Sequence, residues 1–253
     1  MPQAPDPEPI PLRFVKNLRD LGGYPFSRPD GTTGQTAFGV FLRSGSLWLL
    51  TSAGREVLRA CGVRRVVDLR SAFELRYWPG PYLRHPDPEI AYTSVPMLDQ
   101  MNVIADSGNL PESMFEIYRD LLDDDAQTIT SVMRALDGPG CSLFHCRAGK
   151  DRTGVIAMLL LGLAGVDDDH IVEDYAASGE HMSPGKALQF VGLSILMRRR
   201  APKSLFVAEP SQMRQALAHL HAHYGSAREY LLHHAGCEAE VLDRLTARLR
   251  GDA

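Results

Sequence analysis

The sequence predicts an α/β domain in which helices flank a largely parallel β-sheet. Short β-branched or apolar runs alternate with amphipathic helical segments through the first two thirds of the chain, and the last third is helical almost throughout. The chain has 253 residues, 44% hydrophobic and 23% charged, which allows one large domain with a substantial core. No flexible linker separates the helical third, so we expect a single domain over residues 15–253.

The strands of this sheet are expected in the first two thirds of the chain. The run VRRVVDLRS contains the β-branched pair Val66–Val67 and predicts a buried strand that ends near Asp68. The run at residues 90–97 is another candidate strand, which Pro96 should interrupt. The predicted strands are 38–44, 63–68, 90–97 and 141–146.

The predicted helices follow from apolar spacing and from their start and stop residues. Residues 51–62 begin with a Thr-Ser cap, and Gly62 is a typical helix stop. The predicted helices are 51–62, 112–122, 126–136, 153–164, 168–177, 185–198, 209–224 and 238–249.

Composition restricts the class of protein. Residues 1–14 are proline-rich and acidic and predict a disordered lead-in without a cleavable signal pattern. The longest apolar run, 155–166, is shorter than the roughly 20 residues of a membrane span, so we expect no transmembrane segment. The net charge of −4 argues against a nucleic-acid partner. Four scattered cysteines without a CxxC pair suit a reducing, cytoplasmic location, with export without a cleavable signal peptide as the alternative.

One segment combines an unusual set of reactive residues: HCRAGKDRTG, which contains Cys146 and Arg152. A cysteine followed six positions later by an arginine is weak evidence alone, because Cys141 and Arg147 have the same spacing. The residues between Cys141 and Arg147 are apolar and suit a strand. Those between Cys146 and Arg152 are small or polar and lead into a long apolar helix, so only this loop can direct consecutive backbone N–H groups at one anion.

These residue types suit a thiolate that attacks phosphorus. A free thiol has a pKa of about 8.5, whereas reactive cysteines at helix N-termini have pKa values of about 3.5–7.5. The loop N–H groups and the Thr153 hydroxyl are the expected donors to the sulfur of Cys146. The planar guanidinium of Arg152 matches two phosphate oxygens. A Walker-type nucleotide loop is excluded because Asp151 follows the GK pair. An inert structural cysteine would lack this electropositive setting.

The loop resembles the signature of the bacterial tyrosine-phosphatase-like family, HCxAGKDRTG. Matching pieces follow the family's order from about residue 15 to the C-terminus: NLRDLGGY, FLRSGSL, VVDLRS, IVEDYAAS and YGSAREYLLHHAG. The resemblance implies a three-layer cysteine-phosphatase fold. It also implies a phosphatase that hydrolyses phosphate monoesters through a phosphocysteine intermediate, with no metal and no cofactor. Its first substrates would be phosphotyrosine proteins, with phosphoserine and phosphothreonine as further candidates.

The same resemblance assigns roles to individual residues. Cys146 corresponds to the nucleophile and Arg152 to the phosphate-binding arginine. His145 would orient the loop and Thr153 would support the thiolate. Lys150 and Asp151 resemble the charges of members that also accept phosphoinositides, so a lipid phosphatase is the alternative. The implied phosphate-binding loop is Arg147, Ala148, Gly149, Lys150, Asp151 and Arg152, of which Arg147 occupies a variable position.

The general acid that protonates the leaving group is left open among three aspartates. Asp151 lies in the loop and is the first choice, with an ion pair to Lys150 as its structural alternative. Asp68 should lie at the carboxyl end of a core strand, where a structural contact with Arg152 or Arg70 is favoured. Asp99 is expected on a solvated loop.

Two other functional classes explain this loop less well than hydrolysis does. A phosphate-recognition module without turnover would not need Cys146, Asp151 and Arg152 together. A rhodanese-like sulfur carrier would leave the step from Arg152 into the helix unexplained.

Several secondary hypotheses also follow. Asn17, Arg19 and Asp20 are expected to form a hydrogen-bonded brace behind the active site. Cys141 or Cys61 could form a protective disulfide with oxidised Cys146. The histidines cluster at 219, 221, 223, 233 and 234, and the spacing of the first three does not put them on one helical face, so we expect no metal site there.

Overall fold

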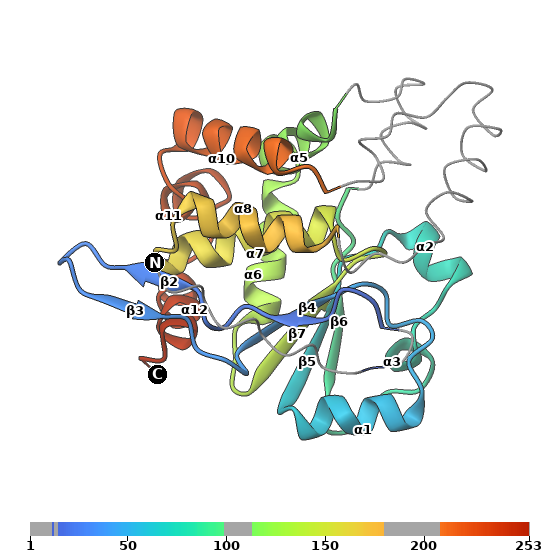
Figure 1. Cartoon of the computed structure of the whole chain (residues 1–253). Helices are drawn as coiled ribbons and strands as arrows, with labels where there is room; N and C mark the ends of the chain where they lie inside the picture. The colour runs from blue at the N-terminus through green and yellow to red at the C-terminus, as the bar shows by residue number, and fades with distance from the viewer. Residues whose placement is uncertain (1–11, 13–14, 99–112, 180–207, 253) are drawn as a thin grey trace, which may run out of the picture.

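The computed structural model describes residues 12, 15–98, 113–179 and 208–252 (Figure 1). Nearly all of the predicted lead-in, the predicted helix 185–198 and Asp99 lie outside the described residues.

The core of the molecule is a five-stranded sheet in the order β1-β4-β7-β5-β6. β4, β7, β5 and β6 are parallel, and the short β1 is antiparallel to β4 at one edge. A separate antiparallel pair, β2 and β3, follows β1 along the chain. The strands are β1 (Arg19–Asp20), β2 (Pro25–Ser27), β3 (Thr33–Gln35), β4 (Phe41–Ser44), β5 (Val63–Asp68), β6 (Ala91–Ser94) and β7 (Cys141–His145).

Helices cover both faces of this sheet, which gives the three layers that the resemblance implied. Alternate residues of β5 point to opposite faces. Val66 belongs to a core cluster with Leu58 and Tyr82, and Val67 belongs to a larger cluster with residues of α5, α6 and α7. The helical elements are α1 (Ser52–Ala60), α2 (Ala72–Tyr77), α3 (Pro81–Arg84), α5 (Met114–Asp123), α6 (Ala126–Leu136), α7 (Asp151–Ala164), α8 (Asp168–Ala177), α10 (Pro210–Tyr224), α11 (Ala227–Glu229), the π-helical turn η2 (Tyr230–His234) and α12 (Ala239–Arg250).

The predicted elements largely agree with this structure. The strands 63–68 and 141–146 and the helices 51–62, 126–136 and 168–177 are confirmed to within two residues at either end. The helix predicted to begin at Thr153 begins at Asp151. The elements that were not predicted are all short, at two to six residues each: β1, β2, β3, α2, α3, α11 and η2.

The register of the strands gathers polar residues at one edge of the sheet. His145 at the end of β7 pairs with Ser44 on β4 and with Asp68 on β5, and Asp68 pairs with Ser94 on β6. Four parallel strands therefore end together where the chain enters the loop before α7. This edge is where sites form in open α/β sheets.

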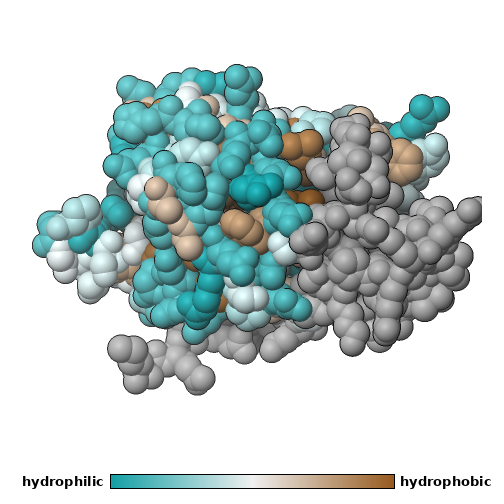
Figure 2. All heavy atoms as spheres, turned by 90° about the horizontal axis from the view of Figure 1, so that it is seen from above, coloured by the Kyte–Doolittle hydropathy of each residue, from teal (hydrophilic) through white to brown (hydrophobic). Residues whose placement is uncertain are grey.

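The surface seen from above is mostly hydrophilic, with hydrophobic residues in small patches (Figure 2). Within the described parts of the chain, no helix is both long and apolar enough to cross a bilayer.

Candidate active site

The loop after β7 holds the sulfur of Cys146 at the base of a tight turn. The Cys146 side chain is buried, and the backbone N–H of Gly149 donates a hydrogen bond to its Sγ over 3.3 Å. Gly149 has a φ of +72°, and a Cβ at this position would lie 2.6 Å from the Ser44 carbonyl oxygen. Only glycine meets both conditions, so this turn directs the Gly149 N–H at the sulfur.

The outer side of the same turn is held by side chains from the N-terminal part of the chain. The carbonyl oxygen of Gly149 accepts hydrogen bonds from Asn17 Nδ2 at 2.7 Å and from the Arg43 guanidinium at 2.8 Å. Asn17 itself adopts a left-handed conformation, with φ of 57°. These two donors fix the peptide that presents the Gly149 N–H group.

A buried charge cluster supports these donors. Asp174 of α8 forms ion pairs with both Arg19 and Arg43. Arg19 also donates to Asn17 Oδ1 and, over 3.0 Å, to the Ser178 hydroxyl. Burial disfavours the Asp174 carboxylate, but the two arginines lower its pKa overall. The predicted brace is confirmed for Asn17 and Arg19, and Asp174 and Arg43 are its unpredicted members. Asp20, the third predicted member, instead accepts from the N–H groups of Gly22 and Gly39.

Arg152 lies in the first turn of α7 and forms a two-point ion pair with Glu74. Its Nη1 and Nη2 atoms lie 2.7 and 3.1 Å from the two carboxylate oxygens of Glu74, and Nη1 also donates to the Leu69 carbonyl at 3.2 Å. This contact orients the plane of the guanidinium. The hypothesis that Asp68 holds Arg152 is therefore wrong.

Glu74 is a site residue that the sequence analysis missed. It belongs to a capping box at the start of α2, in which Glu74 accepts from the Ser71 N–H at 2.9 Å. Burial raises the pKa of Glu74, but Arg152 and the Ser71 N–H lower it overall. The S-x-x-E motif of residues 71–74 directly after VVDLR was the available signal.

Asp68 holds Arg70, as the other structural hypothesis proposed. Both Asp68 oxygens accept from Arg70, with the closest contact at 2.6 Å, and Tyr92 donates to Asp68 over 3.0 Å. His145 Nε2 lies 3.5 Å from Asp68. Burial works against the carboxylate, but His145 and Arg70 lower the pKa of Asp68 overall. Burial lowers the pKa of His145. This network lies directly behind the loop.

Asp151 remains at the surface of the loop region but is held from inside. Its carboxylate accepts a hydrogen bond from the Tyr118 hydroxyl at 2.7 Å, and Lys150 Nζ lies 3.4 Å away. Tyr118 in turn lies 2.6 Å from the Tyr175 hydroxyl. The side chain of Asp151 is 17% exposed, whereas that of Lys150 is 1% exposed. The ion pair expected as the structural alternative is present, and it leaves one side of Asp151 open to solvent.

The remaining predicted loop residues occupy different positions. Thr153 is buried, and its hydroxyl has no hydrogen-bond partner in the described part of the structure, so its role at the thiolate stays a prediction. Arg147 is exposed, with its guanidinium 5.2 Å from the centre of the Trp78 ring. The Arg147 carbonyl accepts from the Ser46 N–H over 3.0 Å. Ala148, the next residue in the loop, is half-buried.

The redox hypothesis for Cys141 and Cys61 is wrong for this fold. Cys141 begins β7 and Cys146 follows its end, and five residues of strand span about 16 Å. A disulfide requires Cα atoms about 4.4–6.8 Å apart. Cys61 ends α1 next to Gly62, whose carbonyl accepts from the Cys141 N–H, so it lies at the amino end of the strands as well.

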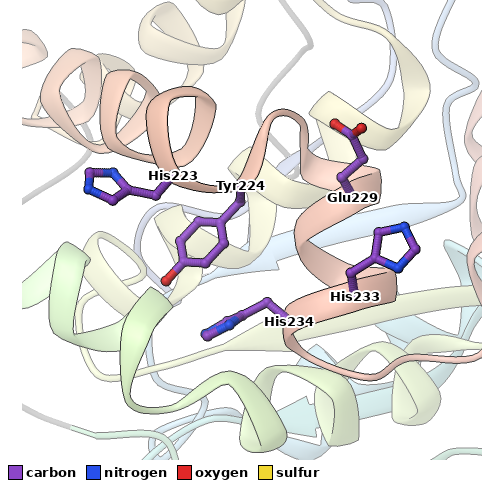
Figure 3. Close-up of a pocket in the computed structure, with 5 residues that line it drawn as sticks. All are labelled: His223, Tyr224, Glu229, His233 and His234. Carbon is purple, nitrogen blue, oxygen red and sulfur yellow. The ribbon is translucent and has the colours of Figure 1, made fainter.

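The histidine-rich region lies on other elements, around a depression of about 300 Å³ (Figure 3). His223 and Tyr224 come from α10, and Glu229, His233 and His234 come from the following turns. The Tyr224 and His234 rings lie 4.5 Å apart. No three His, Cys, Asp or Glu side chains within the described ranges are arranged to hold a metal ion.

Comparison with known proteins identifies the family. The family model described as "Tyrosine phosphatase family" matches residues 10–251. A tyrosine-protein phosphatase of Nostoc commune is 32% identical, over 87% of this chain and 81% of the relative. The triple specificity protein phosphatase PtpB of Mycobacterium tuberculosis is 31% identical, over 64% of this chain and 70% of that protein. The solved structure of P. aeruginosa TpbA covers 71% of this chain and 87% of its own at 18% identity, but its TM-score of 0.37 is too low to support an argument.

The fold and the family match together define a phosphatase. The chain belongs to the tyrosine phosphatase family. It is therefore an enzyme of the hydrolase class, a protein-tyrosine phosphatase.

Proposed function

We propose that this enzyme hydrolyses phosphotyrosine in proteins through a phosphocysteine intermediate on Cys146. The observation that carries the proposal is the hydrogen bond from the Gly149 N–H to the Cys146 sulfur, in a turn that only glycine can form. An N–H group aimed at a buried sulfur favours its anion, which is the nucleophilic form. The lack of a side-chain cap on α7 supports the same conclusion, because the first N–H groups of this helix would face an anion.

In the first step, the sulfur of Cys146 attacks phosphorus. The S–P bond forms while the bond from phosphorus to the tyrosine oxygen breaks. Glu74 contacts the Nη1 and Nη2 atoms of Arg152. The edge of the guanidinium formed by Nε and Nη2 would receive two of the phosphate oxygens, and the loop N–H groups would receive the third.

The departing tyrosine oxygen needs a proton, which we assign to Asp151. Its carboxyl group adjoins the loop and keeps one side open to solvent, whereas Asp68 is fully buried and occupied by Arg70. In the second step, Asp151 would take a proton from water as the water oxygen attacks phosphorus. The S–P bond then breaks, which releases phosphate and restores the thiolate.

Phosphoinositides are the second candidate substrates. Arg147 is exposed and adds a cation to the loop beyond Arg152, which suits a headgroup with several phosphates, whereas Lys150 is buried against Asp151. The relative named as a triple specificity phosphatase also suggests a range of substrates wider than phosphotyrosine. We expect neither reaction to need a metal, so EDTA should leave both unchanged.

A side-by-side assay separates these substrates. Purified enzyme is tested on phosphotyrosine peptides, phosphoserine peptides and a panel of soluble phosphoinositides, with phosphate release as the readout. The proposal predicts the highest kcat/KM on phosphotyrosine. A higher kcat/KM on a phosphoinositide would replace the protein substrate with the lipid. Turnover by the Cys146→Ser variant would overturn the mechanism for both.

A further inference from the structure

Exposed hydrophobic side chains concentrate on one part of the surface. Among the described residues, seven large hydrophobic side chains are exposed. Five of them lie in the loop after β4 or on α2 and α3, which follow β5 along the chain. These five are Trp48, Leu49, Phe73, Tyr77 and Leu83, with exposed fractions between 40% and 59%.

We group these side chains with Trp78 as the aromatic rim. Arg70 links the loop after β4 to the end of α2, because its guanidinium donates to the Ser46 hydroxyl over 3.0 Å and to the Trp78 carbonyl over 2.7 Å. The Phe73 and Tyr77 rings lie 4.7 Å apart, and Tyr77 lies 6.1 Å from Trp78. Arg84, next to Leu83, donates to the Trp48 carbonyl over 3.3 Å. Figure 1 places α2 and α3 on the same side of the molecule. The aromatic rim therefore consists of Trp48, Leu49, Phe73, Tyr77, Trp78 and Leu83.

Within residues 45–54 and 70–85, which contain the aromatic rim, the exposed charges are positive. Arg76 and Arg84 are exposed there, as is Arg147 in the active-site loop. Residues 45–54 contain no acidic residue, and the one acid within residues 70–85 is Glu74, which is buried against Arg152. The chain as a whole has a net charge of −4, so this local excess of arginine runs against the overall balance.

The aromatic rim also adjoins the catalytic loop. The Arg147 guanidinium lies 5.2 Å from the centre of the Trp78 ring. Glu74, which holds Arg152, lies between Phe73 and Tyr77 on the same short helix. A partner bound at the rim would therefore lie next to the active site.

We infer that the aromatic rim docks the enzyme on an anionic lipid bilayer. Trp and Tyr side chains favour the headgroup region of a membrane, and neighbouring arginines pair with anionic lipids. Side chains that project from the surface can insert into a soft bilayer, whereas protein partners mostly bury their anchor residues in pockets. The inference does not depend on which phosphate ester the active site hydrolyses.

Intrinsic fluorescence tests this inference directly, because the chain contains two tryptophans and both belong to the aromatic rim. The full-length enzyme is mixed with vesicles of phosphatidylcholine, with or without phosphatidylserine. Neither lipid is a phosphoinositide. We expect a blue shift and sedimentation with the phosphatidylserine vesicles, and weaker binding without phosphatidylserine. The Cys146→Ser variant should bind as well as the wild type, which separates this test from the proposed reaction.

Variants then locate the binding surface. The double variant Phe73→Ser/Tyr77→Ser should weaken vesicle binding at least about tenfold, because each aromatic side chain loses apolar burial. Arg76→Ala should weaken binding to the anionic vesicles only. The matched controls are Phe38→Ser and Arg214→Ala, which change exposed residues of the same types on other elements. Activity on soluble p-nitrophenyl phosphate shows that each variant is folded.

Three results would overturn the inference. One is a lack of binding to either kind of vesicle by the wild type. Another is an equal loss of vesicle binding in the rim variants and in the control variants. The third is a raised KM for phosphotyrosine peptides in the rim variants with unchanged vesicle binding, which would make the rim a protein-binding surface instead.

Discussion

At the residue scale, Asp151 combines a side chain that is 17% exposed with two inward contacts, to Tyr118 and Lys150. If it protonates the leaving group, Asp151→Asn should lower kcat by about 10²–10⁴-fold on phenyl phosphate, whose leaving group is poor. The loss on p-nitrophenyl phosphate should be smaller, because that leaving group needs less protonation. Steady-state kinetics on the two esters measures the difference. Equal losses would show that Asp151 is not the acid.

Tyr118 is the side chain that positions Asp151. It is fully buried, and burial together with Asp151 raises its pKa well above the usual value, so its hydroxyl keeps its proton and donates. Tyr118→Phe should lower kcat roughly 2- to 10-fold, the equivalent of one hydrogen bond, and shift the pH profile of kcat with little change in KM. Tyr175→Phe keeps the bond from Tyr118 to Asp151 and serves as the control. An unchanged pH profile for Tyr118→Phe would contradict this role.

At the scale of elements, α2 connects a helix cap to the catalytic arginine. Glu74 accepts from the Ser71 N–H and also from Arg152. Glu74→Gln leaves the Arg152 charge buried without a carboxylate, and breaking such a pair typically costs about 3–5 kcal/mol. Urea unfolding should reveal this loss, and kcat/KM should fall with it.

Glu89→Gln, which changes an exposed glutamate, is the matched control and should alter neither quantity. If Glu74→Gln retained both the stability and the kcat/KM of the wild type, Arg152 would not depend on α2 for its orientation.

The strands and long helices could be predicted from the sequence because their periodicity is local. The β-branched core of β5 and the cap and stop of α1 each depend on a few neighbouring residues. The loop chemistry at Cys146 was predictable for the same reason, since its residues are contiguous. The partners from distant segments were not predictable. Glu74 lies 78 positions from Arg152, and Asp174 lies 131 positions from Arg43, so only the folded sheet brings them together.

The two hypotheses that proved wrong fail for the same reason, because the contacts they concern are decided by the folded sheet and not by distance in the sequence. Cys141 is near Cys146 in sequence, but an extended strand separates the two sulfurs. Asp68 lies at the edge of the sheet as expected, yet the choice between Arg70 and Arg152 depended on α2, which is too short to give a periodic signal.

At the scale of the whole molecule, buried carboxylates join the N-terminal segment, α2 and α8 to the sheet. Asp68, Glu74 and Asp174 all have lowered pKa values in the folded state, despite burial, because arginines face them. Their stabilisation is fully present above the ordinary carboxyl pKa of about 4 and is lost as the pH falls through the lower folded values. Burial lowers the pKa of His145, so protonation in the unfolded chain adds a loss below about pH 6.5.

The free energy of unfolding, measured in urea, should therefore decline gently below about pH 6.5 and steeply below about pH 4. The Asp174→Asn variant should have a lower free energy of unfolding near neutral pH than the wild type. Its free energy of unfolding should also fall less steeply as the pH is lowered. An acid dependence identical to that of the wild type would mean that Asp174 does not link these elements.

The most direct test of the mechanism is to locate the phosphate during turnover. Enzyme mixed with p-nitrophenyl phosphate is quenched in acid, digested and analysed by tandem mass spectrometry. The mechanism predicts a phosphate on the sulfur of Cys146 in the wild type and neither adduct nor phosphate release in Cys146→Ser. A phosphorylated residue other than Cys146, or turnover without this sulfur, would contradict it.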